Sequence, residues 1–223
     1  MSPAAKIAVD AINFPATRRA ARILAEKQIL TPDDFYSINA QARSQAFTVS
    51  ADITQRARGV IRDNLAEMIE TGPDRQAFLK RFEKLPLSES HLEQVFRNNT
   101  LSAYSDGLED TLQHPFVYEA FPYRQYIAHH DDRVRDEHLA LESMGLDGTG
   151  IYHIDDPVWQ IFRPPWSWNC RCWFIPLSVI AAANAGVSEA QQWHETGLEP
   201  QHVFVPFPDF LPDPSWIRPP LTT

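Results

Sequence analysis

Cysteine is almost absent from this sequence of 223 residues, which contains only Cys170 and Cys172. A disulfide between two cysteines separated by one residue would be strained, and a reducing cytosol would oppose its formation. A disulfide-stabilised secreted fold is therefore excluded. The two thiols are expected either to share a task, such as binding a metal, or to be ordinary small buried residues.

Glycine and long apolar runs are also scarce. The chain has eight glycines, and no stretch approaches the roughly 20 consecutive apolar residues that cross a bilayer. It contains no phosphate-binding glycine-rich loop, no nucleophile elbow and no His-Glu-x-x-His helix motif. The first residues lack the apolar segment of a secretory signal, so we expect a soluble protein that stays in the cytosol where it is made, without contact to a membrane.

Lysine is missing from residues 113–223, where fourteen Asp and Glu stand against six Arg. Residues 1–112 are nearly balanced, with fifteen acidic and fourteen basic residues. An acidic surface repels phosphate backbones, so tight nonspecific DNA binding by the second half is not expected.

The first half has the patterns of amphipathic helices. Thr31 can cap a helix that starts with Pro32, and apolar residues three and four apart recur between Ile53 and Ile69. Gly72 is expected to end the latter helix. The expected helices cover residues 31–45, 50–69 (capped by Ser50), 73–82 and 88–112, with a short strand at 46–49.

The second half is expected to mix strands and helices. An aromatic and β-branched run at 116–127 favours one or two strands, and residues 173–175 favour another. Short helices are expected at 136–144 and 177–184, and a proline-rich arm after them. The sequence thus predicts an α+β protein with a helical region (1–114), a small mixed module with a few antiparallel strands (115–190) and a proline and aromatic C-terminal arm (191–223).

Four motifs follow one another in an order that resembles the phage Mu F-like minor head protein family, also called head morphogenesis proteins. They are Ala46–Val49, the helical element Arg97–Gly107, the Asp-x-Arg-x-Arg-x-x-His element at 131–138, and a Pro-Pro turn that leads to Cys-Arg-Cys at 164–172. The resemblance extends from about residue 40 to about residue 180. The motif residues that carry it are Asp131, Arg133, Arg135, His138, Asp156, Pro164, Pro165, Asn169 and Arg171.

The resemblance implies a function in virion assembly. It implies a minor capsid protein that acts near the portal in procapsid assembly or in DNA packaging and delivery, not an enzyme. The implied partners are portal, major capsid or scaffolding proteins and, transiently, phage DNA, with no small-molecule substrate. The implied location is the virion head, after synthesis in the host cytoplasm.

A zinc site is a further implication of the resemblance. In a related branch of the family, the positions of Arg135 and His138 form a Cys-x-x-Cys and the position of Ser167 is a histidine. Here only His138, Cys170 and Cys172 remain as soft ligands. Asp131 or Asp132 can supply a fourth ligand, a water can complete three protein ligands, or hydrogen bonds and packing have replaced the metal.

Two other interpretations are open for these residues. The mixed charges around Arg133 and Arg135 are typical of a structural ion-pair network that includes His138. Alternatively, His138 and Asp131 serve a metal-dependent hydrolase, such as a nuclease or a toxin-like domain. In each case, pairing of the 116–127 run with residues 173–175 would bring His138 close to Cys170 and Cys172.

Overall fold

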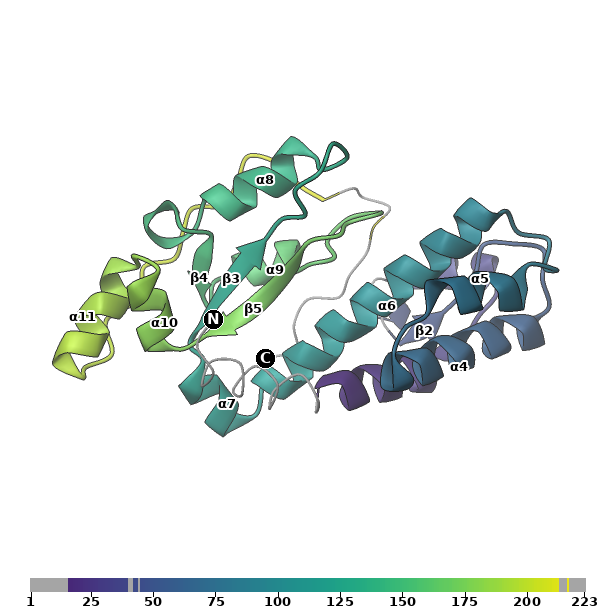
Figure 1. Cartoon of the computed structure of the whole chain (residues 1–223), viewed down its shortest axis with the longest axis horizontal. Helices are drawn as coiled ribbons and strands as arrows, with labels where there is room; N and C mark the ends of the chain where they lie inside the picture. Colours follow the sequence, from purple (N-terminus) through teal and green to yellow (C-terminus); the bar gives the residue numbers. More distant parts are fainter. Residues whose placement is uncertain (1–15, 40–41, 44, 213–215, 217–223) are drawn as a thin grey trace. The chain divides into compact units, whose positions relative to one another are not determined.

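The computed structural model describes residues 16–39, 42–43, 45–212 and 216, and it divides into two compact units. The first unit extends to Thr111 and the second begins at Leu112. Figure 1 shows the first unit as a group of helices and the second as a small sheet with helices around it. In the part of the chain described, no helix is long and apolar enough to cross a membrane.

The first unit is helical, as expected. Residues 16–26 are helical. The elements that follow are β1 (Gln28–Ile29), α2 (Pro32–Ser37), β2 (Ala46–Phe47), α4 (Gln55–Thr71), α5 (Arg75–Phe82) and α6 (Glu89–Leu112). Strands β1 and β2, of two residues each, pair in parallel.

Side-chain caps fix where these helices begin. The Thr31 hydroxyl accepts the N–H of Asp34, and Gly72 ends α4, both as expected. Thr54, not Ser50, caps α4, and Asp74 caps α5 one residue after Pro73. The helix expected at 31–45 already ends at Ser37, where the backbone becomes extended at Ile38; residues 40, 41 and 44 lie outside the described part.

One apolar core holds the first unit together. It joins the helix at 16–26 to β2, α4, α5 and α6 through fully buried residues such as Ile61, Leu65 and Phe78. At Gly107 of α6, an added Cβ would lie 2.3 Å from the carbonyl oxygen of Ala16 and 2.6 Å from the nitrogen of Ala20. Only glycine therefore permits this backbone contact between two helices.

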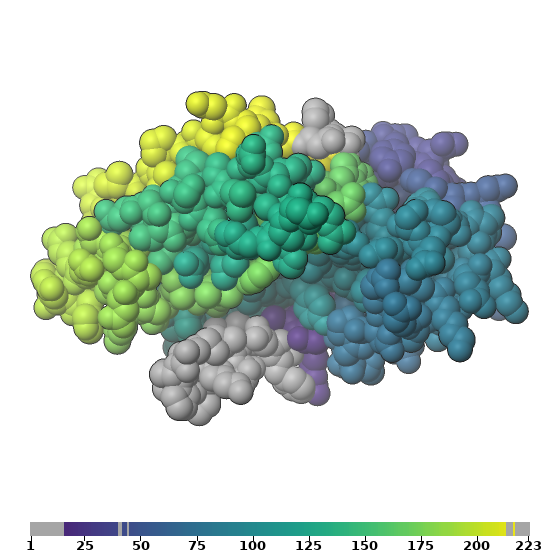
Figure 2. Space-filling view, turned by 45° about the horizontal axis from the view of Figure 1, so that its top comes forward, coloured from purple at the N-terminus to yellow at the C-terminus, as the bar shows by residue number. Residues whose placement is uncertain are grey.

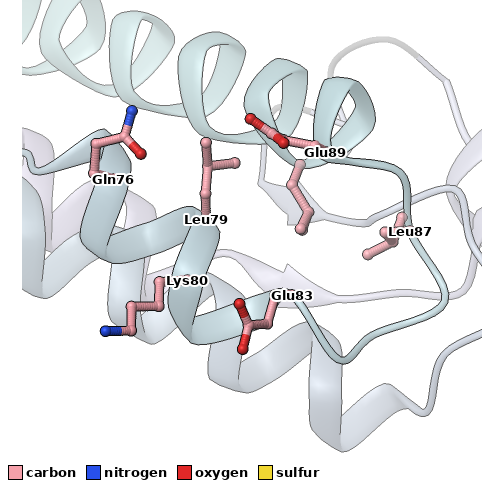
Figure 3. A pocket seen from close by; sticks show the side chains of 7 residues that line it. Gln76, Leu79, Lys80, Glu83, Leu87 and Glu89 are labelled. Carbon is pink, nitrogen blue, oxygen red and sulfur yellow. The ribbon is translucent and has the colours of Figure 1, made fainter.

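A pocket of about 390 Å³ lies between α5 and the start of α6. Leu79 and Leu87 form part of its apolar lining, and Lys80, Glu83 and Glu89 are charged residues at the pocket (Figure 3). None of the motif residues of the second half contributes to it.

The second unit is built on a three-stranded antiparallel sheet with the order β4-β3-β5. In Figure 1, α10 and α11 lie at the end of the sheet where β3 begins. Its elements are α7 (Pro115–Ala120), β3 (Tyr123–Ile127), α8 (Asp136–Ser143), the 3-10 turn η1 (Leu146–Gly148), β4 (Ile151–His153), α9 (Val158–Phe162), β5 (Trp173–Leu177), α10 (Val179–Asn184) and α11 (Ser188–Thr196).

The α+β prediction is confirmed, with several local differences. Residues 116–120, expected as part of a strand, form helix α7 together with Pro115, because Pro115 stands at the first helical turn and needs no N–H partner. The strand begins only after Pro122. The helix expected at 177–184 starts at Val179, after a strand that continues to Leu177. Strand β4 and helices α9 and α11 were not expected.

The C-terminal arm, expected at 191–223, begins later, because residues 191–196 belong to helix α11. Residues 198–212 have no helix or strand. The arm residues after 212, except Trp216, lie outside the described part. The arm runs over the second unit, shown in yellow in Figure 2. The N–H of Val205 donates to the Asp156 carboxylate at 3.1 Å, and the Phe210 ring contacts Phe162 and Trp166. The arm thus docks on its own chain.

Candidate functional site

Strand pairing assembles the motif residues into one site. Strands β3 and β5 pair in the register Ile127 to Trp173, so the loop that follows β3 lies beside the segment that precedes β5. Helix α8, which begins at Asp136, then places His138 over that segment. The expected pairing and the expected proximity of His138 to both cysteines are present.

We call His138, Cys170 and Cys172, together with Arg135 and Ser167, the thiol cluster. The Nδ1 atom of His138 lies 3.2 Å from Sγ of Cys172 and 3.7 Å from Sγ of Cys170. All three side chains are at most 3% exposed. The two thiols face the same imidazole, as expected for residues that alternate along an extended chain.

Arg135 contacts the opposite side of this imidazole. Its guanidinium lies 2.6 Å from Nε2 of His138, and it also donates to the Ser167 hydroxyl and to the Trp168 carbonyl. The Ser167 hydroxyl lies 3.1 Å from the same Nε2. The two positions that carry metal ligands in the related branch are therefore occupied here by residues that hydrogen-bond to each other and to His138.

These contacts determine the proton positions of the cluster. Because a guanidinium only donates, Nε2 of His138 must accept, and the ring proton then lies on Nδ1, toward the thiols. Hydrogen bonds from the Cys170 thiol and from His138 lower the pKa of Cys172 to about 4. Burial raises the pKa of Cys170. The deprotonated form is thus favoured at Cys172 and the protonated form at Cys170, next to the cationic side chain of Arg135.

A zinc ion only partly fits this donor set. Tetrahedral zinc places a bound sulfur and a bound nitrogen about 3.5 Å apart, given bond lengths near 2.3 and 2.0 Å. The two distances from Nδ1 of His138 are close to that value. However, no fourth His, Cys, Asp or Glu joins the three within the described residues. A metal on Nδ1 would also require a proton on Nε2, against the Arg135 guanidinium.

Asp131, expected as a fourth ligand, does not join the thiol cluster. Arg171 binds its carboxylate, at 2.6 Å for one of two contacts, and Arg133 lies 3.5 Å away. The hydrogen bond from Arg171 lowers the pKa of Asp131 well below its usual range. The ion pair expected among neighbours in the sequence is thus formed mainly with an arginine forty residues further on.

The Pro-Pro turn packs over the thiol cluster. The Pro164–Pro165 peptide bond is cis, and the Trp166 ring stacks on the His138 ring with 4.0 Å between centroids. The indole N–H of Trp166 donates to the Tyr126 hydroxyl at 2.9 Å. Asn169 adopts a left-handed conformation with φ of 58°, which turns the chain into the Cys-Arg-Cys segment.

Asp156, another motif residue, links a helix start to the arm. Its carboxylate accepts the N–H of Val158 at 2.9 Å, at the start of α9, and the N–H of Val205. Burial raises the pKa of this carboxyl. Asp156 thus connects the start of α9 to the arm through hydrogen bonds to two backbone N–H groups.

Sequence reasoning missed a second histidine cluster. His153 at the end of β4 stacks on His202 of the arm, and burial together with the His202 charge lowers the pKa of His153 to about 4. No motif or regular spacing connects these two residues, so neither could be singled out from the sequence. Sequence reasoning also missed Arg124, which is fully buried and whose guanidinium lies over the rings of both Trp159 and Phe174.

The fold and the site define a helical unit followed by a small sheet module with a buried His and Cys-x-Cys cluster. The protein-family model described as "Phage Mu protein F like protein" matches residues 59–175, more than half of the chain. The chain belongs to this phage Mu protein F-like family.

Two curated relatives agree with this assignment. The chain is 28% identical over 185 residues to the "Mu-like prophage FluMu F protein" of Haemophilus influenzae, covering 74% of this chain and 43% of that protein. It is 27% identical over 177 residues to the "Putative capsid assembly protein F" of Escherichia phage Mu, covering 69% and 38%. The aligned part spans about two fifths of each relative. No solved structure matches the chain.

Proposed function

We propose that this chain is a minor, non-enzymatic component in head assembly of a tailed phage or prophage. The observation that carries the proposal is the alignment of 69% of the chain with a phage Mu protein whose name describes capsid assembly. The family match includes the whole thiol cluster, so the motif is part of what the chain shares with this family.

Its partners would be the portal, major capsid or scaffolding proteins, and its location the virion head after synthesis in the host cytoplasm. Residues 113–223 are acidic, which favours protein partners over prolonged contact with DNA. Any contact with phage DNA would then be transient and salt-sensitive.

Within this function, we propose that the thiol cluster is a structural centre that needs no metal. Arg135 supplies the positive charge that a metal would otherwise bring to the thiolate and imidazole. This arrangement does not favour the alternative of a metal-dependent hydrolase. Asp131, the carboxylate expected to orient a water beside His138, is bound to Arg171 instead.

Phage production from a lysogen or clone lacking this gene tests the assembly role. We expect few or no filled heads, and rescue by the wild-type chain supplied in trans. Mass spectrometry of purified heads should then detect the chain at low copy relative to the major capsid protein. Normal yields of infectious heads without the gene, or absence of the chain from heads and procapsids, would contradict the proposal.

A further inference from the structure

A second group of side chains with metal-binding donors lies outside the thiol cluster. His153 of β4 and the arm residues Glu199 and His202 place one donor atom each within 4.8 Å of one another. The two imidazole rings stack with 3.5 Å between centroids and 26° between planes. We call these three residues, together with Glu189 of α11, the imidazole–carboxylate cluster.

A carboxylate lies beside the Nδ1 atom of each histidine. Nδ1 of His202 is 3.0 Å from Glu189, and Nδ1 of His153 is 3.8 Å from Asp155. Metal-bound histidines usually donate the proton of their other nitrogen to such a carboxylate, which orients the ring and increases its basicity. For His202, this arrangement leaves Nε2 for a metal, whereas Nδ1 of His153 accepts the N–H of Asp155 at 3.2 Å, so the His153 ring has to turn before its Nε2 can bind one. Nε2 of His202 already lies 3.3 Å from Glu199.

The surrounding charges favour a cation at this position. Three carboxylates lie next to the two imidazoles, Glu189 and Glu199 beside His202 and Asp155 beside His153, whereas one cation, Arg124, lies close enough to lower the pKa of His153. Two imidazoles and one carboxylate are also a donor set that zinc uses in proteins, with water in the fourth position.

We propose that His153, His202 and Glu199 bind a divalent transition-metal ion, with Zn²⁺ as the expected occupant, which fastens the arm to the second unit. Two of the three ligands belong to the arm and the third to the sheet. Binding would therefore cross-link segments that are about fifty residues apart in the sequence. On metal binding, the His153 ring would exchange the hydrogen bond that its Nδ1 accepts from the Asp155 N–H at 3.2 Å for one that it donates to the Asp155 carboxylate.

The test uses the full chain, stripped with a chelator and then titrated with Zn²⁺ alone. We expect one Zn²⁺ per chain and a higher melting temperature when it is bound. His202→Gln and the milder variant Glu199→Gln, at an exposed position, should each weaken binding by about tenfold or more. His194→Gln, an exposed histidine of α11, is the matched control and should bind like the wild type.

Two further measurements separate this site from the thiol cluster. The double variant Cys170→Ser, Cys172→Ser should still bind Zn²⁺, and Co²⁺ bound to the wild type should show no thiolate-to-cobalt charge-transfer absorption. Loss of binding in the cysteine variant, retained binding in both His202→Gln and Glu199→Gln, or no binding to the wild type would overturn the proposal. These outcomes are independent of the assembly role, because they are measured on the isolated chain.

Discussion

The second unit contains two histidine-centred clusters that differ in the charge of their neighbours. In the thiol cluster, the guanidinium of Arg135 binds the nitrogen of His138 that points away from the sulfurs. In the imidazole–carboxylate cluster, Glu189 binds the corresponding position of His202. A neighbouring cation opposes a metal ion and a neighbouring anion favours it. We therefore expect the neighbouring charges, and not the donor atoms alone, to determine whether either site can bind a metal.

Removing the cation from the thiol cluster should cause the largest change in zinc binding and in the free energy of unfolding. Arg135→Cys replaces the guanidinium by a third thiol, giving the Cys₃His set of structural zinc sites. We expect this variant, made in the His202→Gln background, to bind one Zn²⁺ per chain and to gain several kcal/mol of unfolding free energy when loaded, because structural zinc binding is itself folding free energy.

Zinc content and chemical denaturation with and without Zn²⁺ measure this effect. Arg133→Cys, at an exposed neighbouring position, is the control and should bind none. If Arg135→Cys also bound no zinc, the guanidinium would not be what keeps metal out of the cluster.

Deleting the central imidazole should have the next largest effect. His138→Ala removes a buried ring that stacks on Trp166 and leaves Arg135 and the thiolate without their shared partner. We expect a loss of about 3 kcal/mol of unfolding free energy in urea denaturation. His130→Ala, at an exposed histidine, should change it by less than about 0.5 kcal/mol. Equal losses for the two variants would contradict a central role for His138.

The turn before the two cysteines should have a smaller effect. Asn169 has a positive φ that β-branched residues avoid. Asn169→Val should therefore cost about 1–2 kcal/mol of unfolding free energy, whereas Asn169→Gly should stay within about 0.5 kcal/mol of the wild type. Similar values for Val and Gly would show that the turn conformation is not required for the thiol cluster.

The outer ion pair should have the smallest effect, and that effect should depend on pH. Asp131 has a folded-state pKa below its unfolded value near 3.9, so its stabilising contribution is fully present above about pH 5. This contribution is lost as the pH falls from the unfolded-state pKa of Asp131 toward its folded-state pKa. Asp131→Asn should thus be less stable than the wild type at pH 7, and the difference should shrink near pH 3.

Thermal unfolding at the two pH values checks this prediction, with Asp132→Asn as the control. A difference between Asp131→Asn and the wild type that is the same at pH 7 and pH 3 would show that the carboxylate charge does not contribute.

Local signals in the sequence were sufficient for much of the fold and for the thiol cluster. Caps such as Thr31 and breaks such as Gly72 act within one turn of chain, and the alternation of Cys170 and Cys172 places both thiols on one side. The error at residues 116–120 has a local cause as well. A proline at the first helical turn outweighed a β-branched and aromatic composition, which is a weak preference that context overrides.

The imidazole–carboxylate cluster could not be predicted in this way. Its residues come from the end of β4, from α11 and from the arm, with no regular spacing between positions 153, 189, 199 and 202. They meet only because the arm folds back over the sheet. The partner of Asp131 was missed for a similar reason, because Arg171 approaches it from the segment that precedes β5.

Gly107 has a mechanical consequence for the first unit. The two helices that meet there touch through backbone atoms, with no side chain between them that could change rotamer. Such a contact cannot slide or tilt by small side-chain adjustments, so the helix at 16–26 and this part of α6 should move together. A hinge between helices would therefore have to lie elsewhere in the chain.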